Sequence, residues 1–244
     1  MSASSAVLRD SFEDLALANH ILAHQHVLDG FGHVSMRHPE RPDHYLLARN
    51  MAPERVTADD ILELDLDSRI VTQGEHRSFL ERFIHGEIYA ARPEVMGIVH
   101  SHSHSVLPLG VTTAAPLRSV CHMGGFLGVA TPVFEIRDVR GDETDLLISD
   151  AGLGKALAGT LGDSAAVLMR GHGVTVVGIS LRQAVFRAVY TEINARIQLQ
   201  AMAIGPVNYL TEAEGRAAAA TNDGQMNRAW DLWCEQAKRA RAGQ

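Results

Sequence analysis

The stretch Ile98-Val99-His100-Ser101-His102-Ser103-His104 decides how the rest of the sequence is interpreted. Apolar residues lead into it, which predicts a short buried strand. Successive side chains of a strand point to opposite faces, so His100 and His102 would point the same way and share one metal ion. His104 has the same parity, but we expect the chain to bend before Pro108 and leave His104 outside the ligand set. The alternative is a histidine-rich loop without a metal.

A metal site needs a third protein ligand and an open position for chemistry, and neutral imidazole suits Zn, Mn, Fe or Co. Two apolar runs, residues 165–169 and 174–177, predict strands joined by Arg170-Gly171-His172-Gly173. Glycine on each side of His172 lets the backbone approach a ligand closely. We therefore predict His172, at a hairpin bend, as the third metal ligand. A buried structural histidine is the alternative.

Composition and charge limit the class of protein. The 244 residues are 46% hydrophobic and 21% charged, which predicts a single domain over residues 1–244 with a full core. The formal net charge of −7, without a long basic run, argues against nucleic acid as a partner. Cys121 and Cys234 cannot form a disulfide framework, and the sequence has no evident signal peptide or membrane span. We expect a cytoplasmic protein without a membrane partner.

Periodicity and turn residues predict the elements around these histidines. Before them we expect a helix over residues 10–29 ending at Gly30, paired strands over 31–36 and 45–48, a helix start at Thr57 and a hairpin turn at Asp67-Ser68. After them we expect a strand over 131–136, a helix over 153–161, a long helix over 180–203 and helical segments over 211–240. Gly152-Leu153-Gly154-Lys155 lacks the spacing and the following Ser or Thr of a phosphate-binding loop.

A further helix, over residues 79–92, precedes the histidine strand and ends at Pro93. Within it Glu81, His85 and Tyr89 are four residues apart, so they share one helix face. A helix docked beside the strand would aim Glu81 at the ion held by the histidines. The alternative is an ordinary solvent-exposed ion pair between Glu81 and a neighbouring arginine, Arg77 or Arg82.

Glu81, His100-Ser101-His102 and Arg170-Gly171-His172-Gly173, in this order and spacing, resemble the class II aldolase/adducin family. The similarity extends from the first helix to about Ala203. The resemblance implies an α/β fold, an α/β/α sandwich with a central mixed, largely antiparallel sheet. It implies a divalent metal ion, most readily Mn or Zn, held by His100, His102 and His172, with Glu81 as the acid/base. It also implies a homotetramer with its sites at subunit interfaces.

The sequence departs from the sugar-phosphate aldolases and epimerases of that family at three phosphate-binding segments. Gly32-His33 replaces Gly-Asn, Ala48-Arg49-Asn50 replaces Ser-Gly or Thr-Gly, and Phe79-Leu80 replaces Ser-Ser. The small hydroxyls and backbone donors that suit a phosphate are thereby lost. Arg49 and His33 suit a carboxylate instead, and Phe79 and Leu80 can cover a flat ring. These four side chains are the predicted substrate-binding residues.

A fourth departure concerns the position of a catalytic tyrosine. The aldolases carry a Tyr before a Met, where this sequence reads Cys121-His122-Met123, so His122 takes that place. Together with Phe31-Gly32-His33-Val34-Ser35 and the helical sequence from Tyr190 to Gln198, this substitution makes the chain look like the family's aromatic-acid decarboxylases. Among these are 3-hydroxy-2-methylpyridine-4,5-dicarboxylate decarboxylase and 3,4-dihydroxyphthalate decarboxylase. Tyr209, after the long helix, is either a group that reaches a neighbouring subunit's site or a surface anchor.

The resemblance therefore implies a metal-dependent decarboxylase of a hydroxylated aromatic or pyridine (di)carboxylic acid. The divalent ion would act as Lewis acid, and Glu81 or His122 would protonate the ring carbon. A class II aldolase-type lyase that cleaves a carbon–carbon bond of a hydroxy acid or sugar is the main alternative. A non-catalytic adducin-like interaction module and an iron-dependent oxygenase are two others.

Overall fold

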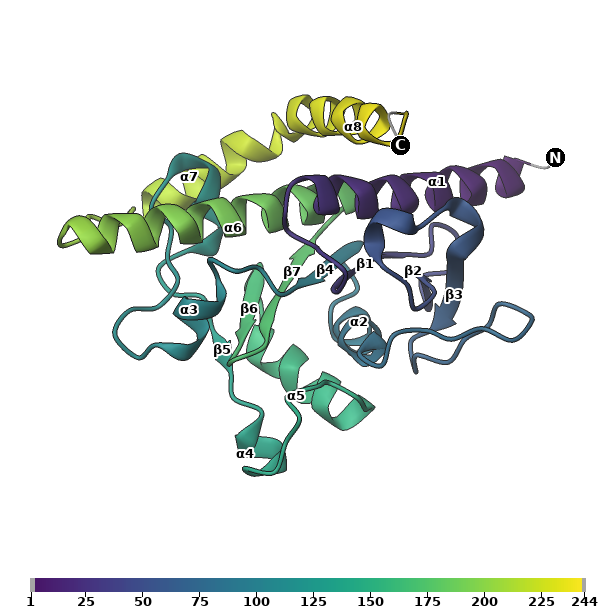
Figure 1. Cartoon of the computed structure of the whole chain (residues 1–244), viewed down its shortest axis with the longest axis horizontal. Helices are drawn as coiled ribbons and strands as arrows, with labels where there is room; N and C mark the ends of the chain where they lie inside the picture. Colours follow the sequence, from purple (N-terminus) through teal and green to yellow (C-terminus); the bar gives the residue numbers. More distant parts are fainter. Residues whose placement is uncertain (1–2, 243–244) are drawn as a thin grey trace.

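The computed structural model describes residues 3–242 and centres on a seven-stranded sheet in the order β3-β2-β1-β4-β7-β6-β5 (Figure 1). Neighbouring strands are antiparallel except β5 and β6, which run parallel. The predicted mixed, largely antiparallel sheet is therefore confirmed. The strands are β1 (His33–Arg37), β2 (His44–Ala48), β3 (Ile61–Asp65), β4 (Gly97–Ser101), β5 (Val133–Phe134), β6 (Ala166–Met169) and β7 (Gly173–Gly178).

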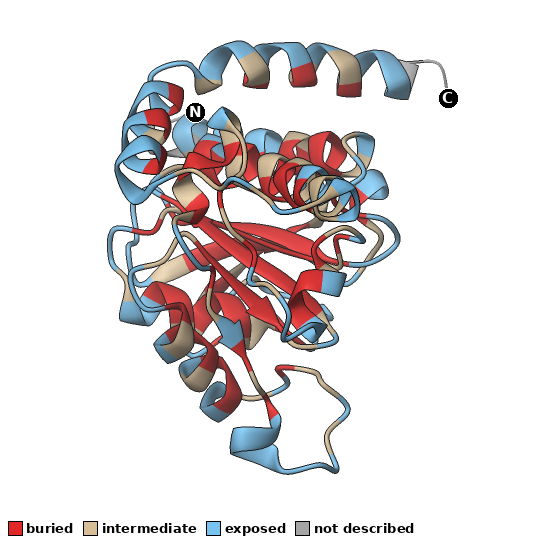
Figure 2. Cartoon of the chain, turned by 90° about the vertical axis from the view of Figure 1, so that its left-hand side faces the viewer, coloured by how far each residue is buried: buried red, intermediate tan, exposed pale blue. Residues whose placement is uncertain are grey.

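Helices cover both faces of the sheet, and the buried strands lie between them (Figures 1 and 2). One face carries α1 (Ala3–His24) and α6 (Leu181–Ile204), with α8 (Met226–Ala242) packed over them; α2 (Arg82–Ala91) and α5 (Ala151–Leu161) lie on the other. Alternation along each strand divides the core in two. On β4, for example, Val99 packs in the cluster with α1 and α6, whereas Ile98 packs in the cluster with α2 and α5. The α/β/α sandwich is confirmed.

The remaining elements are short or peripheral: α3 (Leu107–Val111), α4 (Arg137–Arg140), α7 (Glu212–Asp223) and the 3-10 turns η1 (Pro53–Arg55), η2 (Ala58–Asp60) and η3 (His122–Leu127). Thr57 does cap η2 with a capping box, as its sequence signal indicates, although the helix is a single turn. The predicted hairpin at Asp67-Ser68 is present, with Leu64 bridged to Ile70. Across residues 3–242, none of the helices has the length and apolar character needed to cross a membrane.

The first helix differs from its predicted range at both ends. It begins by Ala3 and ends at His24 instead of reaching Gly30. His26 adopts a left-handed φ of 58°, and the N–H of Val27 donates to the carbonyl of Leu22 at 2.9 Å. This is a Schellman-type ending with histidine in the position where glycine is commonest. The glycine signal was therefore misleading about where the helix stops.

Two other elements are shorter than the sequence indicates. The helix predicted over residues 79–92 begins at Arg82, so Glu81 is its N-cap residue and has left the helical face shared by His85 and Tyr89. The strand predicted over 131–136 has only Val133 and Phe134, which pair with β6 at the edge of the sheet. Pro132 precedes it and has no N–H with which to extend the ladder.

Candidate active site

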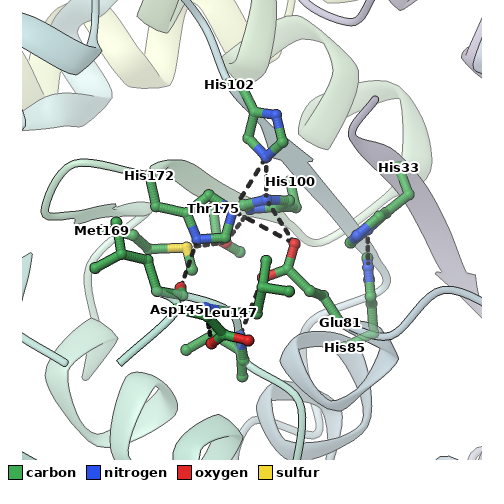
Figure 3. Close-up of polar contacts among 12 residues, drawn as sticks. His33, Glu81, His85, His100, His102, Asp145, Leu147, Met169, His172 and Thr175 are labelled. Carbon is green, nitrogen blue, oxygen red and sulfur yellow. Dashed lines mark hydrogen bonds and ion pairs between the residues drawn. The ribbon is translucent and has the colours of Figure 1, made fainter. Parts of the chain in front are cut away.

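Three imidazoles from two distant parts of the chain converge on one point (Figure 3). His100 lies at the end of β4, His102 follows that strand, and His172 occupies the bend between β6 and β7. Nε2 of His102 lies 3.2 Å from Nε2 of His100 and 3.1 Å from Nε2 of His172. The structure therefore brings the three predicted metal ligands together.

The cluster has the composition and spacing that a divalent cation requires. One nitrogen from each histidine and one carboxylate oxygen of Glu81 all lie within 4.8 Å of one another. Two nitrogens that each lie about 2.1 Å from one ion are about 3.0–3.4 Å apart for the usual ligand angles. The observed separations of the Nε2 atoms match that range. The donor set thus fits a Zn- or Mn-type ion, with positions left open for a substrate.

Hydrogen bonds to the other ring nitrogens orient two of these imidazoles. His172 Nδ1–H donates to the carbonyl of Leu146 at 2.9 Å, and Nδ1 of His100 lies 3.3 Å from Oγ1 of the buried Thr175. Such partners direct Nε2 toward the metal position, as is usual for metal-binding histidines. Leu146 has a φ of 69°, a left-handed conformation that leucine rarely adopts. The strained backbone at Leu146 supplies one of the orienting groups.

Glu81 faces the same point from the opposite side of the cluster. Its Oε1 accepts from the N–H of Ile148 at 3.1 Å, and its Oε2 lies 3.4 Å from Nε2 of His172 and 3.6 Å from Nε2 of His100. Burial alone would raise the pKa of Glu81, but the two imidazoles and the Ile148 amide lower that pKa to about 2. Glu81 is therefore a carboxylate aimed at the cluster, and the solvent-exposed ion pair with Arg77 or Arg82 does not form.

The protonation of the histidines follows from burial and from this carboxylate. Burial lowers the pKa of His100 well below its usual value and lowers that of His102 as well. Burial acts on His172 in the same direction, but the hydrogen bond and charge of Glu81 raise its pKa overall. A metal ion binds the neutral imidazole, so an ion at the cluster and a proton on Nε2 of His172 exclude each other.

A pocket of about 330 Å³ opens beside the cluster. Its lining includes Glu81, His102 and three of the four predicted substrate-binding residues, His33, Phe79 and Leu80. The His33 ring is buried, with its centroid 4.7 Å from that of Phe79. The volume and the mixture of apolar walls with few polar groups suit a single aromatic ring. A neighbouring cavity of about 890 Å³ is larger, but it contains none of the three predicted metal ligands.

Three predicted site residues belong neither to the lining of this pocket nor to the histidine cluster. Nε of Arg49 donates to Asp60 at 2.6 Å, and about half of the Arg49 side chain is exposed. His122 lines a separate groove beside α7. Tyr209 lies over the guanidinium of Arg118, with 4.1 Å from the Arg118 Cζ to the ring centroid. The structure therefore leaves the roles predicted for Arg49, His122 and Tyr209 without support from their position in one chain.

Several contributors were not predicted from the sequence. The Leu146 carbonyl and the Ile148 amide are backbone groups of an irregular segment, and no side-chain pattern could have marked them. Phe31 also lines the pocket, with its ring centroid 6.4 Å from that of His102. The position of Phe31 between two glycines, Gly30 and Gly32, was a usable sequence signal.

Two proteins named as decarboxylases are similar to this chain over most of its length. The chain is 39% identical over 237 residues to the decarboxylase tropJ of Talaromyces stipitatus, covering 88% of this chain and 89% of that protein. It is 30% identical over 207 residues to the 3,4-dihydroxyphthalate decarboxylase of Arthrobacter keyseri, covering 79% of each. Both relatives support a lyase.

The fold has close counterparts among solved structures. L-fuculose 1-phosphate aldolase from Glaciozyma antarctica superposes with a TM-score of 0.79 at 21% identity, over 100% of this chain and 94% of that one. At this identity the likeness supports the fold alone. Residues 13–199 match the model of the class II aldolase and adducin N-terminal domain. The chain therefore belongs to the class II aldolase/adducin family.

Proposed function

We propose that this chain is a metal-dependent decarboxylase of a hydroxylated aromatic or pyridine (di)carboxylic acid. The observation that carries the proposal is the meeting of three imidazole Nε2 atoms and one Glu81 oxygen beside a pocket walled by Phe79. The family relationship and the two relatives named as decarboxylases support it. The name of one relative specifies a dihydroxyphthalate, which is a hydroxylated aromatic dicarboxylate.

The reaction breaks the bond between the ring and one carboxylate, leaves the electron pair on the ring carbon and then places a proton there. A divalent ion such as Mn or Zn, bound by the three histidines, would supply a Lewis acid that stabilises the negative charge. Glu81 is the acid/base candidate that borders the pocket in the same chain. Its Oε2 would take the proton of a ring hydroxyl and return it to the carbon that has lost carbon dioxide.

The pocket residues support this substrate class. Phe79 and Leu80 would cover the faces of a flat ring, and His33 would donate a hydrogen bond to a carboxylate that the reaction retains. Arg49 would bind the same carboxylate with the guanidinium nitrogens that do not contact Asp60. This part of the proposal requires the Arg49 side chain to turn toward the pocket when substrate binds.

His122 and Tyr209 could act in the proposed reaction only at the active site of a neighbouring subunit in an oligomer. His122 is exposed in a groove with Leu210 and Glu214, outside the pocket of its own chain. In a homotetramer with interfacial sites, either residue would reach the pocket of a neighbouring subunit. There His122 would be the second proton-donor candidate.

The deciding experiment is an activity screen of the purified protein with Mn or Zn against a small panel of hydroxylated benzene- and pyridine-dicarboxylates. Stoichiometric release of carbon dioxide supports the proposal. The same metal and carboxylate would also serve a class II aldolase-type lyase. An aldehyde product from a hydroxy acid or sugar, without carbon dioxide, would favour that lyase.

A further inference from the structure

A chain of buried hydrogen bonds leads away from the pocket into the core below it. Nδ1 of His33 lies 2.6 Å from Nε2 of His85, and Nδ1 of His85 lies 2.6 Å from Oγ of Ser35. Oγ of Ser35 in turn lies 2.9 Å from the hydroxyl of Tyr89. His85, Ser35 and Tyr89 are at most 1% exposed, so no water competes for these contacts.

Local structure brings these four side chains together. His33 and Ser35 lie two residues apart on β1, so both face the side of the sheet that α2 covers. His85 and Tyr89 lie four residues apart on α2 and face that same side. Figure 3 shows the near end of the chain, with His85 rising from α2 to meet His33. The hydrogen-bond chain therefore joins the pocket to the core through side chains whose positions are set by β1 and α2.

The number of available hydrogens determines which group donates at each contact of this hydrogen-bond chain. A neutral imidazole carries one N–H, so the shared contact uses a hydrogen either from His33 or from His85. If His33 donates, then His85 donates to Ser35 and Ser35 donates to Tyr89. The Tyr89 hydroxyl hydrogen then has no acceptor, because its hydrogen-bond partner among the described residues, Ser35, is already the donor in that contact. Leaving a buried hydroxyl hydrogen unused costs free energy.

The opposite direction leaves no buried hydroxyl hydrogen unused. Tyr89 donates to Ser35, Ser35 donates to Nδ1 of His85, and Nε2–H of His85 donates to Nδ1 of His33. The remaining proton of His33 is then on Nε2, the ring nitrogen that makes no hydrogen bond to another described residue. Because His33 lines the pocket, its Nε2–H is available to an acceptor there.

Burial also keeps the chain neutral. It lowers the pKa of His85 to about 3 and raises the pKa of Tyr89 above its usual value. His85 therefore does not store a proton near neutral pH, and Tyr89 does not give one up. The hydrogen-bond chain therefore stores no exchangeable proton, and its contacts instead determine which nitrogen of His33 carries hydrogen.

We propose that Ser35 and His85, with Tyr89 as the terminal donor, are positioning residues that hold His33 as an Nε2–H hydrogen-bond donor to an anionic substrate oxygen. The identity of that oxygen, a retained carboxylate, rests on the proposed decarboxylase function. The tautomer of His33 does not, because it follows from the buried contacts alone. A merely structural network would stabilise the fold without fixing the tautomer of a pocket residue.

The test is ¹⁵N NMR of the Zn-loaded protein with ¹⁵N-labelled histidine, with the His33 signals assigned by their loss in His33→Gln. Imidazole ¹⁵N shifts distinguish a protonated from an unprotonated ring nitrogen. We expect hydrogen on Nε2 of His33 in the wild type. Ser35→Ala leaves both tautomers with equal numbers of unused groups, so it should populate both. Hydrogen on Nδ1 in the wild type, or an unchanged tautomer in Ser35→Ala, overturns the proposal.

Two further variants sharpen this result. His85→Leu removes the partner of His33 directly and should also mix the tautomers, which keeps the test decisive if Ser35→Ala folds poorly. Tyr45→Phe is the matched control. The buried hydroxyl of Tyr45 donates to Ser68, and its ring stacks on that of His85 with 6.2 Å between the centroids. Tyr45 nevertheless takes no part in the hydrogen bonds that link Tyr89 to His33. The His33 signals should be unchanged in Tyr45→Phe.

Kinetics provide the second readout. With a substrate from the dicarboxylate panel, Ser35→Ala should raise KM on the order of three- to ten-fold, as expected for one hydrogen bond, and leave kcat within about two-fold. A fall in kcat at unchanged KM contradicts the positioning role. If no panel compound is decarboxylated, the proposed function fails. The NMR result still decides whether the buried hydrogen-bond chain sets the His33 tautomer.

Discussion

The amide N–H of Ile148 donates to Oε1 of Glu81 at 3.1 Å, and this bond turns the other oxygen of that carboxylate toward His100 and His172. A carboxylate with one oxygen held by the backbone has little freedom to rotate. Glu81 therefore presents a fixed oxygen to the cluster although it stands at the N-cap of α2. The segment before α5 and the start of α2 together fix the position of the proposed acid/base, Glu81.

Removing one imidazole should abolish metal binding. His172→Ala leaves two histidine ligands, and we expect the metal content of the purified protein to fall from near stoichiometric to background. The measurement is elemental analysis after dialysis against equal concentrations of Mn and Zn. The control is His104→Ala, since His104 is exposed and lies beyond the ligand pair on the same stretch. A metal content that survives His172→Ala contradicts the ligand assignment.

Arg49→Ala tests the carboxylate-binding role that the sequence assigns to Arg49. If the guanidinium nitrogens that do not contact Asp60 bind the substrate carboxylate, KM should rise by roughly ten-fold or more in Arg49→Ala, with metal content unchanged. Steady-state kinetics and elemental analysis supply the two readouts. Arg239→Ala is the control, because Arg239 also pairs with a carboxylate but is exposed on α8. Unchanged substrate binding and turnover in Arg49→Ala would show that the Asp60 contact is its whole role.

A matched pair of glycines tests the packing of α5 on α2. A Cβ at Gly154 would lie 2.5 Å from the carbonyl oxygen of Phe83, whereas a Cβ at Gly159 would meet nothing within 4 Å. Gly154→Ala should therefore lower the free energy of unfolding by about 1–3 kcal/mol. Gly159→Ala should raise it by up to about 1 kcal/mol, because alanine favours a helix interior. Chemical denaturation of both variants checks the pair, and equal effects would contradict the close approach.

The buried His85 predicts a pH dependence of stability. Burial lowers its pKa in the folded protein to about 3, and an unfolded histidine titrates near its usual pKa of about 6.5. Between these values the unfolded chain binds a proton that the folded chain does not, so stability falls as the pH falls from about 6.5 toward 3. Replacing this group by a residue that does not titrate should make the fall shallower.

The measurement compares wild type with His85→Gln in metal-free buffer from pH 7 to pH 4.5. The slope of unfolding free energy against pH should decrease by up to about 1.4 kcal/mol per pH unit in the variant. Histidines common to both proteins contribute equally and cancel in the difference. Parallel pH profiles would mean that His85 has the same pKa in the folded protein as in the unfolded chain, which contradicts the effect of burial.

Sequence predicted the parts of this site that side-chain patterns carry. Strand alternation placed His100 and His102 together, and flanking glycines marked the bend at His172. Sequence could not predict the Leu146 carbonyl or the Ile148 amide, because the conformation of an irregular segment depends on its tertiary surroundings. Arg49 pairs with Asp60, which lies in a neighbouring turn, and no periodic pattern in the sequence indicates this pair.

The fold shows the same division. Periodicity fixed the order and type of the main elements, and the family resemblance supplied the layers. Element ends were less predictable, as the last residue of α1, His24, and the first residue of α2, Arg82, show. After His24 a Schellman-type ending formed with His26 in the left-handed position, and the Glu81 side chain faces the cluster instead of the helix.

The most direct test of the central claim is release of ¹³CO₂ from a carboxyl-labelled hydroxylated aromatic dicarboxylate. We predict one ¹³CO₂ per ring product from the Mn- or Zn-loaded protein, loss of release after chelation, and recovery when metal is restored. Glu81→Gln should keep the metal and lower kcat by about 10²–10⁴-fold. Release that is equally fast in chelator-treated protein, or in Glu81→Gln, would contradict the account.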